Sequence, residues 1–300
     1  MTAEPVVDAV FRLPPAGRIA GLLLVVFAAS LFPAAATAQE TDGYDYPSGS
    51  TPPEVASRML EMADVGPSDT VYDLGSGEGD IVILAARQYG ATGAGIEIDS
   101  ALVADSRRAA REAGVADRVR FVHGNFYDVE IRPATVVTTY LLPGTMNDLQ
   151  PYLFRELRAG TRIVSHDFDM DRWPADSSTG WWGGVGGRTT LFLWIVPARV
   201  GGTWEIRIAG GDALRMEVDQ NFQRIRAAVD GDGTIDVAEA GLAGDSVRFR
   251  LEGRRFGPDG TTLRGTATLS GMSGRTDGGE SWRGRRVAFS DSSLVGWTSR

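Results

Sequence analysis

The chain has 300 residues, of which 43% are hydrophobic and 23% charged, a composition typical of folded proteins with a substantial core. Its formal net charge is −9, and all 30 basic residues are arginines scattered along the sequence, which argues against nucleic acid as a partner. Cysteine is absent, so the sequence excludes disulfides and thiolate metal sites, and we expect no metal site of another kind.

The N-terminal residues 1–38 have the pattern of a secretory signal peptide. Arg12 and Arg18 precede an apolar run over residues 19–32, and small residues follow up to Ala38. This run is short for a membrane span, and the residues after it are acidic. We therefore expect cleavage after Ala38, export to the periplasm or the exterior, and no stable membrane span afterwards. An uncleaved leader that anchors the protein in the membrane is the alternative, and residues 39–50 are expected to form a linker.

Residues 51–198 alternate between helical and strand-like segments. A helix is expected from Pro53, a strand at 71–74, a helix at 80–89, a strand at 93–98 and a helix at 100–113. Strands follow at 119–123 and 135–140, then a helix carrying Leu149, Leu153 and Leu157, and a strand at 161–165. Residues 177–188 are expected to form a loop or loose hairpin before a last strand at 189–196. This order predicts a Rossmann-like α/β domain with a mostly parallel sheet, which binds its ligand at the carboxyl ends of the strands.

Residues 199–300 have a different pattern, with short alternating segments and glycine-rich turns. The alternating segments lie at 204–208, 214–218, 222–226, 247–251, 262–269 and 282–289. They predict an all-β antiparallel C-terminal domain, with a small closed barrel as one form that it can take. Residues 230–239 resemble part of a calcium loop, but its first ligand position would be Ala228, so we expect a hairpin turn there.

The turn at Gly75–Gly79 is the first feature that points to chemistry. It follows a buried strand directly, Asp73 lies two residues before its first glycine, and Glu97 ends the next strand. Glycines let a ligand approach the backbone, and a carboxylate after the second strand can accept hydrogen bonds from ribose hydroxyls. A dinucleotide fingerprint would need glycine where this chain has Asp80. The acidic turn therefore suits a cationic sulfonium without phosphates better than a pyrophosphate.

Three segments of this region, at 71–80, 95–99 and 124–128, resemble the successive signatures of class I S-adenosylmethionine-dependent methyltransferases. Those at 50–55, 136–143 and 155–170 resemble bacterial relatives of the mitochondrial lysine methyltransferases that act on adenine nucleotide translocase and the ATP synthase c-ring protein. The resemblance covers about half the chain and implies S-adenosylmethionine as cofactor. It implies cofactor-binding roles for Asp73, Gly75, Gly77, Glu97, Asn125 and Phe126, with Thr51 and Pro52 as a covering flap. Asn125 replaces the usual aspartate beside the adenine, although its amide oxygen can also accept a hydrogen bond.

Candidate acceptor-side residues follow the fourth and fifth strands. Tyr140 and Pro143 are placed to bind substrate, and Tyr140, His166 and Asp167 are the candidate catalytic residues. A core aromatic is an equal alternative for Tyr140, and a histidine that is merely hydrogen-bonded to its neighbours is an alternative for His166.

Two functions of different kinds remain open. The first is methyl transfer from S-adenosylmethionine, with a protein lysine amine as one acceptor and a small molecule as another. The second is a non-catalytic exported envelope protein that keeps the fold to bind a ligand or partner. The intact glycine turn with Glu97 favours the enzyme, while the leader raises the question of how an exported enzyme would reach a cytoplasmic cofactor.

Overall fold

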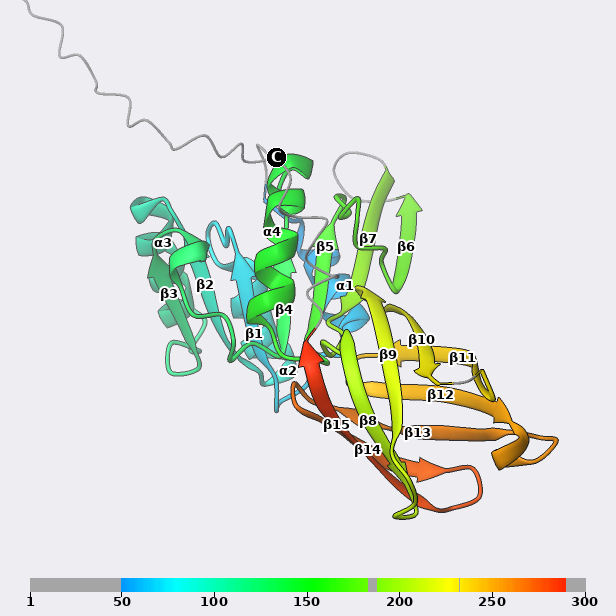
Figure 1. Cartoon of the computed structure of the whole chain (residues 1–300). Helices are drawn as coiled ribbons and strands as arrows, with labels where there is room; N and C mark the ends of the chain where they lie inside the picture. The colour runs from blue at the N-terminus through cyan, green and yellow to red at the C-terminus, as the bar shows by residue number, and fades with distance from the viewer. Residues whose placement is uncertain (1–49, 183–187, 232, 290–300) are drawn as a thin grey trace, which may run out of the picture. The chain divides into compact units, whose positions relative to one another are not determined.

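The computed structural model describes residues 50–182, 188–231 and 233–289, which form two β-sheets and the helices that cover the first of them (Figure 1). The predicted leader and nearly all of the predicted linker lie outside these residues. Among the residues described, no helix is both long and apolar enough to cross a membrane.

The first sheet has seven strands in the order β3-β2-β1-β4-β5-β7-β6. The five strands β1 to β5 run parallel to one another. Strand β7 is antiparallel to β5, and β6 is antiparallel to β7. The elements of this half are α1 (Pro53–Met62), β1 (Thr70–Leu74), α2 (Asp80–Tyr89), β2 (Thr92–Glu97), α3 (Ser100–Glu112), β3 (Val119–His123), η1 (Phe126–Asp128), β4 (Val136–Thr139), α4 (Pro143–Glu156), β5 (Arg162–His166), β6 (Ser177–Trp182) and β7 (Arg188–Ile195). The predicted Rossmann-like, mostly parallel sheet is thus confirmed.

Helices cover both faces of this sheet because the strands alternate apolar residues between them. On one face, Met59 and Leu60 of α1 are buried against Val71 and Val164, and α2 and α3 continue that layer. On the other face, α4 packs against Leu74 and its neighbours. Each fully buried side chain of this size contributes about 1.5–3 kcal/mol. With both faces covered, the ends of the strands are the natural place for a polar ligand site.

The second sheet has eight antiparallel strands in the order β10-β9-β8-β15-β14-β13-β12-β11. They are β8 (Gly202–Ile208), β9 (Leu214–Asn221), β10 (Arg224–Asp230), β11 (Ile235–Ala243), β12 (Ser246–Gly253), β13 (Thr261–Ala267), β14 (Gly271–Thr276) and β15 (Ser281–Phe289), with the 3-10 turn η2 (Arg254–Phe256) after β12. Strict alternation buries every second residue of β9, and the first and last strands of the order, β10 and β11, come into contact. The sheet therefore curls into a nearly closed barrel around Trp204, Phe249 and Trp282, as the alternation predicted.

Four segments differ from the sequence-based expectation. Residues 235–239, expected within a hairpin turn, belong to strand β11 and pair with β12. Residues 177–182, expected in a loop or loose hairpin, form β6 and pair with β7. Phe222, expected inside a strand, lies in the turn between β9 and β10 with a left-handed φ of 52°. Strand β14 was not expected because its glycines and serine hide the alternation. In each case pairing with a neighbouring strand decides the structure, and this pairing is not visible in a local window.

The turn that carries Phe222 joins the two sheets. Phe222 is only 3% exposed and stacks on Trp173, with ring centroids 5.0 Å apart, inside the core beneath α4. The buried Gln220 side chain accepts hydrogen bonds from the amides of Val200 and Gly201 and donates to the carbonyls of Ala198 and Phe222. The connection between the last strand of the first sheet and the first strand of the barrel is therefore fixed by side chains of the barrel.

Candidate active site

The glycine turn after β1 leads directly into α2. Gly75, Gly77 and Gly79 have left-handed φ angles of 79°, 53° and 84°, which other residues rarely adopt. A Cβ at Gly79 would lie 2.4 Å from the ring of Phe121, whereas a Cβ at Gly77 would face open space. Gly79 thus lets the turn pack on β3, and Gly77 presents open backbone at the end of the sheet.

Asp73 is a buried carboxyl group beneath this turn. The Thr138 hydroxyl donates to its Oδ1 at 2.8 Å. The pKa of Asp73 is raised to about 7, mainly by burial and also by repulsion from Glu97 and Asp80, while the Thr138 hydrogen bond opposes the shift. A positive charge nearby would favour the ionised form of Asp73, so the site is suited to a cation.

Glu97, at the end of β2, ties the turn to the next strand. Its Oε2 accepts from the Gly77 amide at 2.9 Å, and its Oε1 accepts from the amides of Ile98 and Asp99 at 2.8 and 3.0 Å. A carboxylate has about four acceptor positions. Three are filled here, so in this conformation the free acceptor position for a ribose hydroxyl is on Oε2.

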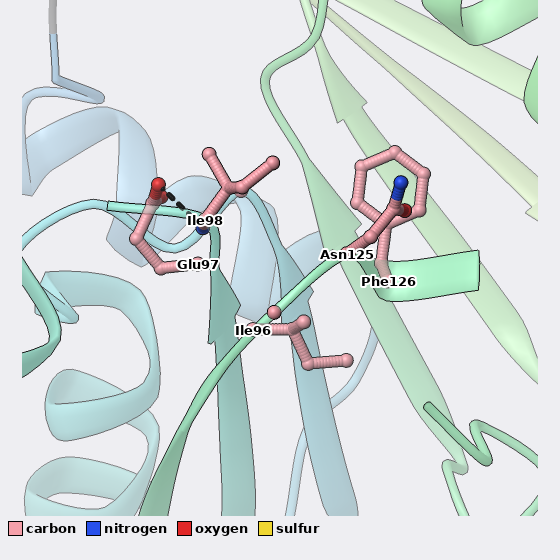
Figure 2. Close-up of a pocket in the computed structure, with 7 residues that line it drawn as sticks. Ile96, Glu97, Ile98, Asn125 and Phe126 are labelled. Carbon is pink, nitrogen blue, oxygen red and sulfur yellow. Dashed lines mark hydrogen bonds between the residues drawn. The ribbon is translucent and has the colours of Figure 1, made fainter. Parts of the chain in front are cut away.

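A cleft lies beside Glu97, between the ends of β2 and β3 (Figure 2). The cleft is shallow and opens to solvent, and its lining residues are Gly75, Ile96, Glu97, Ile98, Gly124, Asn125 and Phe126. Four residues with implied cofactor roles are thus brought together in one cleft. Ile98, which the sequence reasoning missed, belongs to the same segment as Glu97 and could have been found from that position.

Asn125 and Phe126 lie across the cleft from Glu97 (Figure 2). The Asn125 Oδ1 accepts from the Tyr127 amide at 3.0 Å and caps the short helix η1. Its second lone pair stays available, so the suggested bond to an adenine amine is compatible with this geometry. Phe126 is largely buried and supports the floor of the cleft from the core beneath α4.

The chemistry of this donor set fits S-adenosylmethionine. The cleft is lined by one carboxylate and by no arginine, and a buried acid with a raised pKa lies beneath the turn. Phosphates would find no cation in this lining, whereas a sulfonium cation would be attracted to Asp73 and Glu97. Asp73, Gly75, Gly77 and Glu97 are the residues that would hold the cofactor around the turn.

A second cluster forms where β4 and β5 end. Tyr140 stacks on His166, with ring centroids 4.1 Å apart, and on Phe168 at 5.9 Å. The Thr51 hydroxyl lies 3.2 Å from Nδ1 of His166, and Oδ2 of Asp167 lies 3.4 Å from its Nε2. The structure therefore brings the three candidate catalytic residues together and joins the predicted flap residue Thr51 to them through His166. Phe168, a further aromatic wall that the sequence reasoning missed, directly follows His166 and Asp167.

Asp167 is held in an unusual backbone conformation. Its φ is 61°, in the left-handed region that few residues other than glycine adopt. Its amide donates to the Thr190 carbonyl at 2.7 Å, and its Oδ1 accepts from the Thr190 amide at 2.8 Å. These bonds to β7 fix the carboxylate so that Oδ2 faces His166, and such strain is often found at functional positions.

Burial keeps the His166 imidazole neutral near pH 7. Desolvation lowers the pKa of His166, and the nearby Asp167 carboxylate only partly offsets this effect. The pKa of the Tyr140 hydroxyl is raised, mainly by desolvation and further by Asp167, so the phenol stays protonated. The cluster thus offers a neutral imidazole, a protonated phenol and a carboxylate side by side.

The two proline candidates lie at helix starts. Pro52 is the residue before α1, next to Thr51, and Pro143 is the exposed first residue of α4, three residues beyond Tyr140. The sequence roles of both prolines stay predictions. Among the residues described, no group of three or more histidine, aspartate or glutamate side chains could hold a metal ion.

Strand order brings the two clusters to the same edge of the sheet. Leu74 of β1 is opposite Thr139 of β4, which is opposite Ser165 of β5. The glycine turn, Tyr140 and His166 therefore follow three adjacent strands, within about 10 Å of each other. A ligand on the turn and an acceptor beside Tyr140 can meet at this edge.

Comparison with known proteins identifies the family. Residues 73–177 match the family described as ANTKMT methyltransferase domain. A protein-lysine N-methyltransferase of Saccharolobus islandicus is 44% identical over 124 residues, which cover 41% of this chain and 77% of that protein. The chain belongs to this family of methyltransferases.

The relatives differ in the share of each chain that the alignment covers. The mouse adenine nucleotide translocase lysine N-methyltransferase is 36% identical, but the alignment covers 34% of this chain and 45% of that protein. A solved RNA methyltransferase from Salinibacter ruber, in complex with S-adenosyl-L-homocysteine, is 51% identical over 49% of this chain and 94% of that chain, with a TM-score of 0.47. All these matches cover less than half of the present chain.

The family settles several predictions about the methyltransferase. The fold, the enzyme class and S-adenosylmethionine as cofactor are confirmed, and the non-catalytic alternative finds no support among the relatives. The roles of individual site residues stay predictions that the geometry accommodates. Export and signal cleavage concern residues outside those described and also stay predictions.

Proposed function

We propose that this methyltransferase transfers a methyl group from S-adenosylmethionine to the side-chain amine of lysine in another protein. The cluster of Tyr140, His166 and Asp167 beside the glycine turn carries the proposal. The relatives named as lysine N-methyltransferases support it. The chain itself contains no lysine, so a lysine acceptor must come from another molecule.

The cluster has the features that a lysine side chain would need. The rings of Tyr140 and Phe168 are partly exposed and offer an aromatic surface to the aliphatic stem and the ammonium group. The Asp167 carboxylate is about one-third exposed and can attract the ammonium from solution. Because Thr51 covers His166 from the side of α1, the same residues help to exclude water from the reacting atoms.

The amine must lose a proton before it can attack. S-adenosylmethionine, when bound, supplies a methyl group that is already activated by its sulfonium. Desolvation beside the aromatic walls lowers the pKa of the amine. His166, kept neutral by burial, can accept the proton at Nδ1 through the Thr51 hydroxyl, which takes the proton of the amine as it gives its own to the ring. The residues of this chain therefore mainly orient the amine and hold the proton.

We further propose that the reaction takes place outside the cytoplasm or at the membrane. The support is the pattern of arginines, apolar run and small residues over 1–38. Fusion of alkaline phosphatase to residue 45 should give active phosphatase if the leader is exported. An inactive fusion with normal expression would place the enzyme in the cytoplasm.

A transfer assay tests the lysine proposal. The full-length protein is incubated with methyl-labelled S-adenosylmethionine and envelope proteins, total RNA or small-molecule extract, and labelled proteins are hydrolysed to amino acids. We expect methyl-lysine, and none of it can come from the enzyme. Label confined to RNA or to small molecules would contradict the proposal.

Asp167→Asn is the matched variant for this assay. Asparagine keeps the shape, tolerates the left-handed φ and can still accept from Thr190, but it lacks the charge. We expect about 10-fold to 100-fold less methyl transfer with unchanged cofactor binding, since a hydrogen bond to a charged group contributes about 1.5–3 kcal/mol. Asp169→Asn, which alters an exposed carboxylate two residues away, is the control and should keep full activity.

A further inference from the structure

The register of the barrel gathers arginines that are far apart in the sequence. Arg248 of β12 is opposite Arg264 of β13, which is opposite Arg275 of β14. In the next row, Arg283 of β15 is opposite Arg207 of β8. We call these five residues the arginine face, and they lie on neighbouring strands of the barrel (Figure 1).

The arginine face points away from the barrel core. Arg207, Arg264, Arg275 and Arg283 are exposed, and the side chain of Arg248 is 42% exposed. The residues in register with them are hydroxylic, with Ser246, Thr266 and Ser273 in the row of Arg283 and Ser281 opposite Arg275. Guanidinium and hydroxyl groups are both hydrogen-bond donors to phosphate.

The stability of the sheet does not explain this arrangement. Like charges directly opposite each other destabilise a sheet. Arg248 pairs with Glu239, but within the described part of the chain Arg207, Arg264, Arg275 and Arg283 form no ion pair. The face thus keeps positive charge on a chain whose net charge is −9. Charge held at a cost to the fold indicates an anionic partner.

Exposed apolar side chains adjoin the arginine face. Among the described residues, the exposed large hydrophobics are Leu269, Val287 and Phe289, with exposures of 50%, 41% and 51%. Val287 follows Arg283 and Arg285 along the exposed side of β15. The Arg286 amide donates to the Ser270 carbonyl at 3.1 Å, which brings the turn that carries Leu269 against this end of β15.

We propose that the arginine face, together with Leu269 and Val287, docks the protein on a membrane surface with anionic phosphate head groups. Interfacial binding combines basic side chains on head groups with shallow insertion of apolar ones, and both lie here on one part of the barrel. Non-specific binding of single-stranded nucleic acid would instead use aromatic stacking platforms among the arginines, and the rows of the arginine face hold none. The proposal is independent of the methyl acceptor.

Vesicle co-sedimentation of the full-length protein tests the docking surface. Binding is compared between neutral phosphatidylcholine vesicles and vesicles with about a third of phosphatidylglycerol, at low and high salt. Residues 19–32 are apolar and can bind to both kinds of vesicle in every sample. The measured quantity is therefore the ratio of binding to anionic vesicles over binding to neutral ones. We expect a preference for anionic vesicles, and we expect high salt to remove it.

The key variant is Arg264→Gln/Arg275→Gln/Arg283→Gln. Each basic residue near an anionic surface contributes about five-fold, so we expect roughly 100-fold weaker binding to anionic vesicles. The control Arg87→Gln/Arg224→Gln/Arg226→Gln removes the same charge from exposed positions elsewhere and should lose little. An unchanged or raised melting temperature of the first variant shows that it folds, because it relieves opposed charges.

Three results would overturn the proposal. These are equal binding to both kinds of vesicle, equal losses in the two triple variants, or binding of an RNA oligomer through the arginine face without binding to anionic vesicles. The last would assign the face to nucleic acid. Leu269→Ser/Val287→Ser should weaken binding to anionic vesicles at low salt by several-fold relative to the unaltered protein, and unchanged binding would contradict a part for these two residues in the docking surface.

Discussion

The two sheets gather their functional side chains in different ways. In the parallel sheet, the side chains of the candidate site lie at or just after the ends of strands β1 to β5, so each strand contributes a short contiguous segment. In the antiparallel barrel, the arginine face takes single residues from five strands, between positions 207 and 283. A parallel sheet therefore builds its site from short motifs that can be recognised in the sequence. An antiparallel barrel builds a surface from residues that are far apart in the sequence.

The largest expected effect concerns the contact between the barrel and the half of the molecule that contains the parallel sheet. Phe222 belongs to the barrel but is buried with Trp173 and Phe154 of the other half. We expect Phe222→Ala to lower the free energy of unfolding by about 3–5 kcal/mol, because it leaves a cavity in that core. Urea unfolding followed by circular dichroism measures the change.

Phe289→Ala is the control for this experiment. Phe289 is in the same barrel but half exposed, and its replacement should change stability by less than about 0.5 kcal/mol. Equal effects of the two variants would show that Phe222 does not join the halves.

The next effect concerns the cofactor end of the parallel sheet. We expect Glu97→Ala to weaken S-adenosylmethionine binding by about 100-fold, since it removes a charged hydrogen-bond acceptor and releases the Gly77 amide from β2. Calorimetric titration measures the affinity, and Glu112→Ala, at an exposed position on α3, serves as control. If Glu97→Ala binds like the unaltered protein, the cleft beside Glu97 is not the cofactor site.

A smaller effect follows from the raised pKa of Asp73. A cation binds best to the ionised carboxylate, so affinity for S-adenosylmethionine should rise by about ten-fold between pH 6 and pH 8 as Asp73 loses its proton near pH 7. Without ligand, the free energy of unfolding changes with pH in the opposite direction. The folded protein favours protonated Asp73, so it loses stability as the pH rises from about 4 through 7. Asp73→Asn should flatten both profiles, and a pH-dependent affinity that persists in Asp73→Asn would exclude Asp73 as its source.

The smallest effect lies on the arginine face. Arg264 is opposite arginines on both sides, so Arg264→Gln should raise the free energy of unfolding by up to about 0.5 kcal/mol, most visibly at low salt. Arg215→Gln, which breaks the ion pair with Asp230, should not stabilise the protein and is the control. A loss of stability in Arg264→Gln would show that the opposed charges support the fold.

Most of the cofactor end could be predicted from the sequence because its residues are local. Asp73, the glycines and Glu97 each adjoin a strand that its own apolar run reveals. The hydrogen bonds that already occupy Glu97 could not be predicted, since they depend on the turn folding back onto β2. The joining of Thr51 to His166 across 115 residues was likewise visible only in the structure.

The barrel could be predicted only as a class. Alternation revealed its strands, but β14 with its glycines, and the place of Phe222 in a turn, depend on cross-strand pairing. The arginines looked scattered because register, not spacing along the chain, brings Arg248, Arg264 and Arg275 together. Composition alone therefore underestimated the surface that these residues form.

The most direct test of the central claim is calorimetric titration of the full-length protein with S-adenosylmethionine at pH 8. The acidic, glycine-shaped site predicts one molecule bound per chain, with a dissociation constant of roughly 1–100 µM. It also predicts weaker binding of S-adenosylhomocysteine, which lacks the sulfonium charge that Asp73 and Glu97 would attract. No binding at millimolar concentration would contradict the assignment of this turn as the cofactor site.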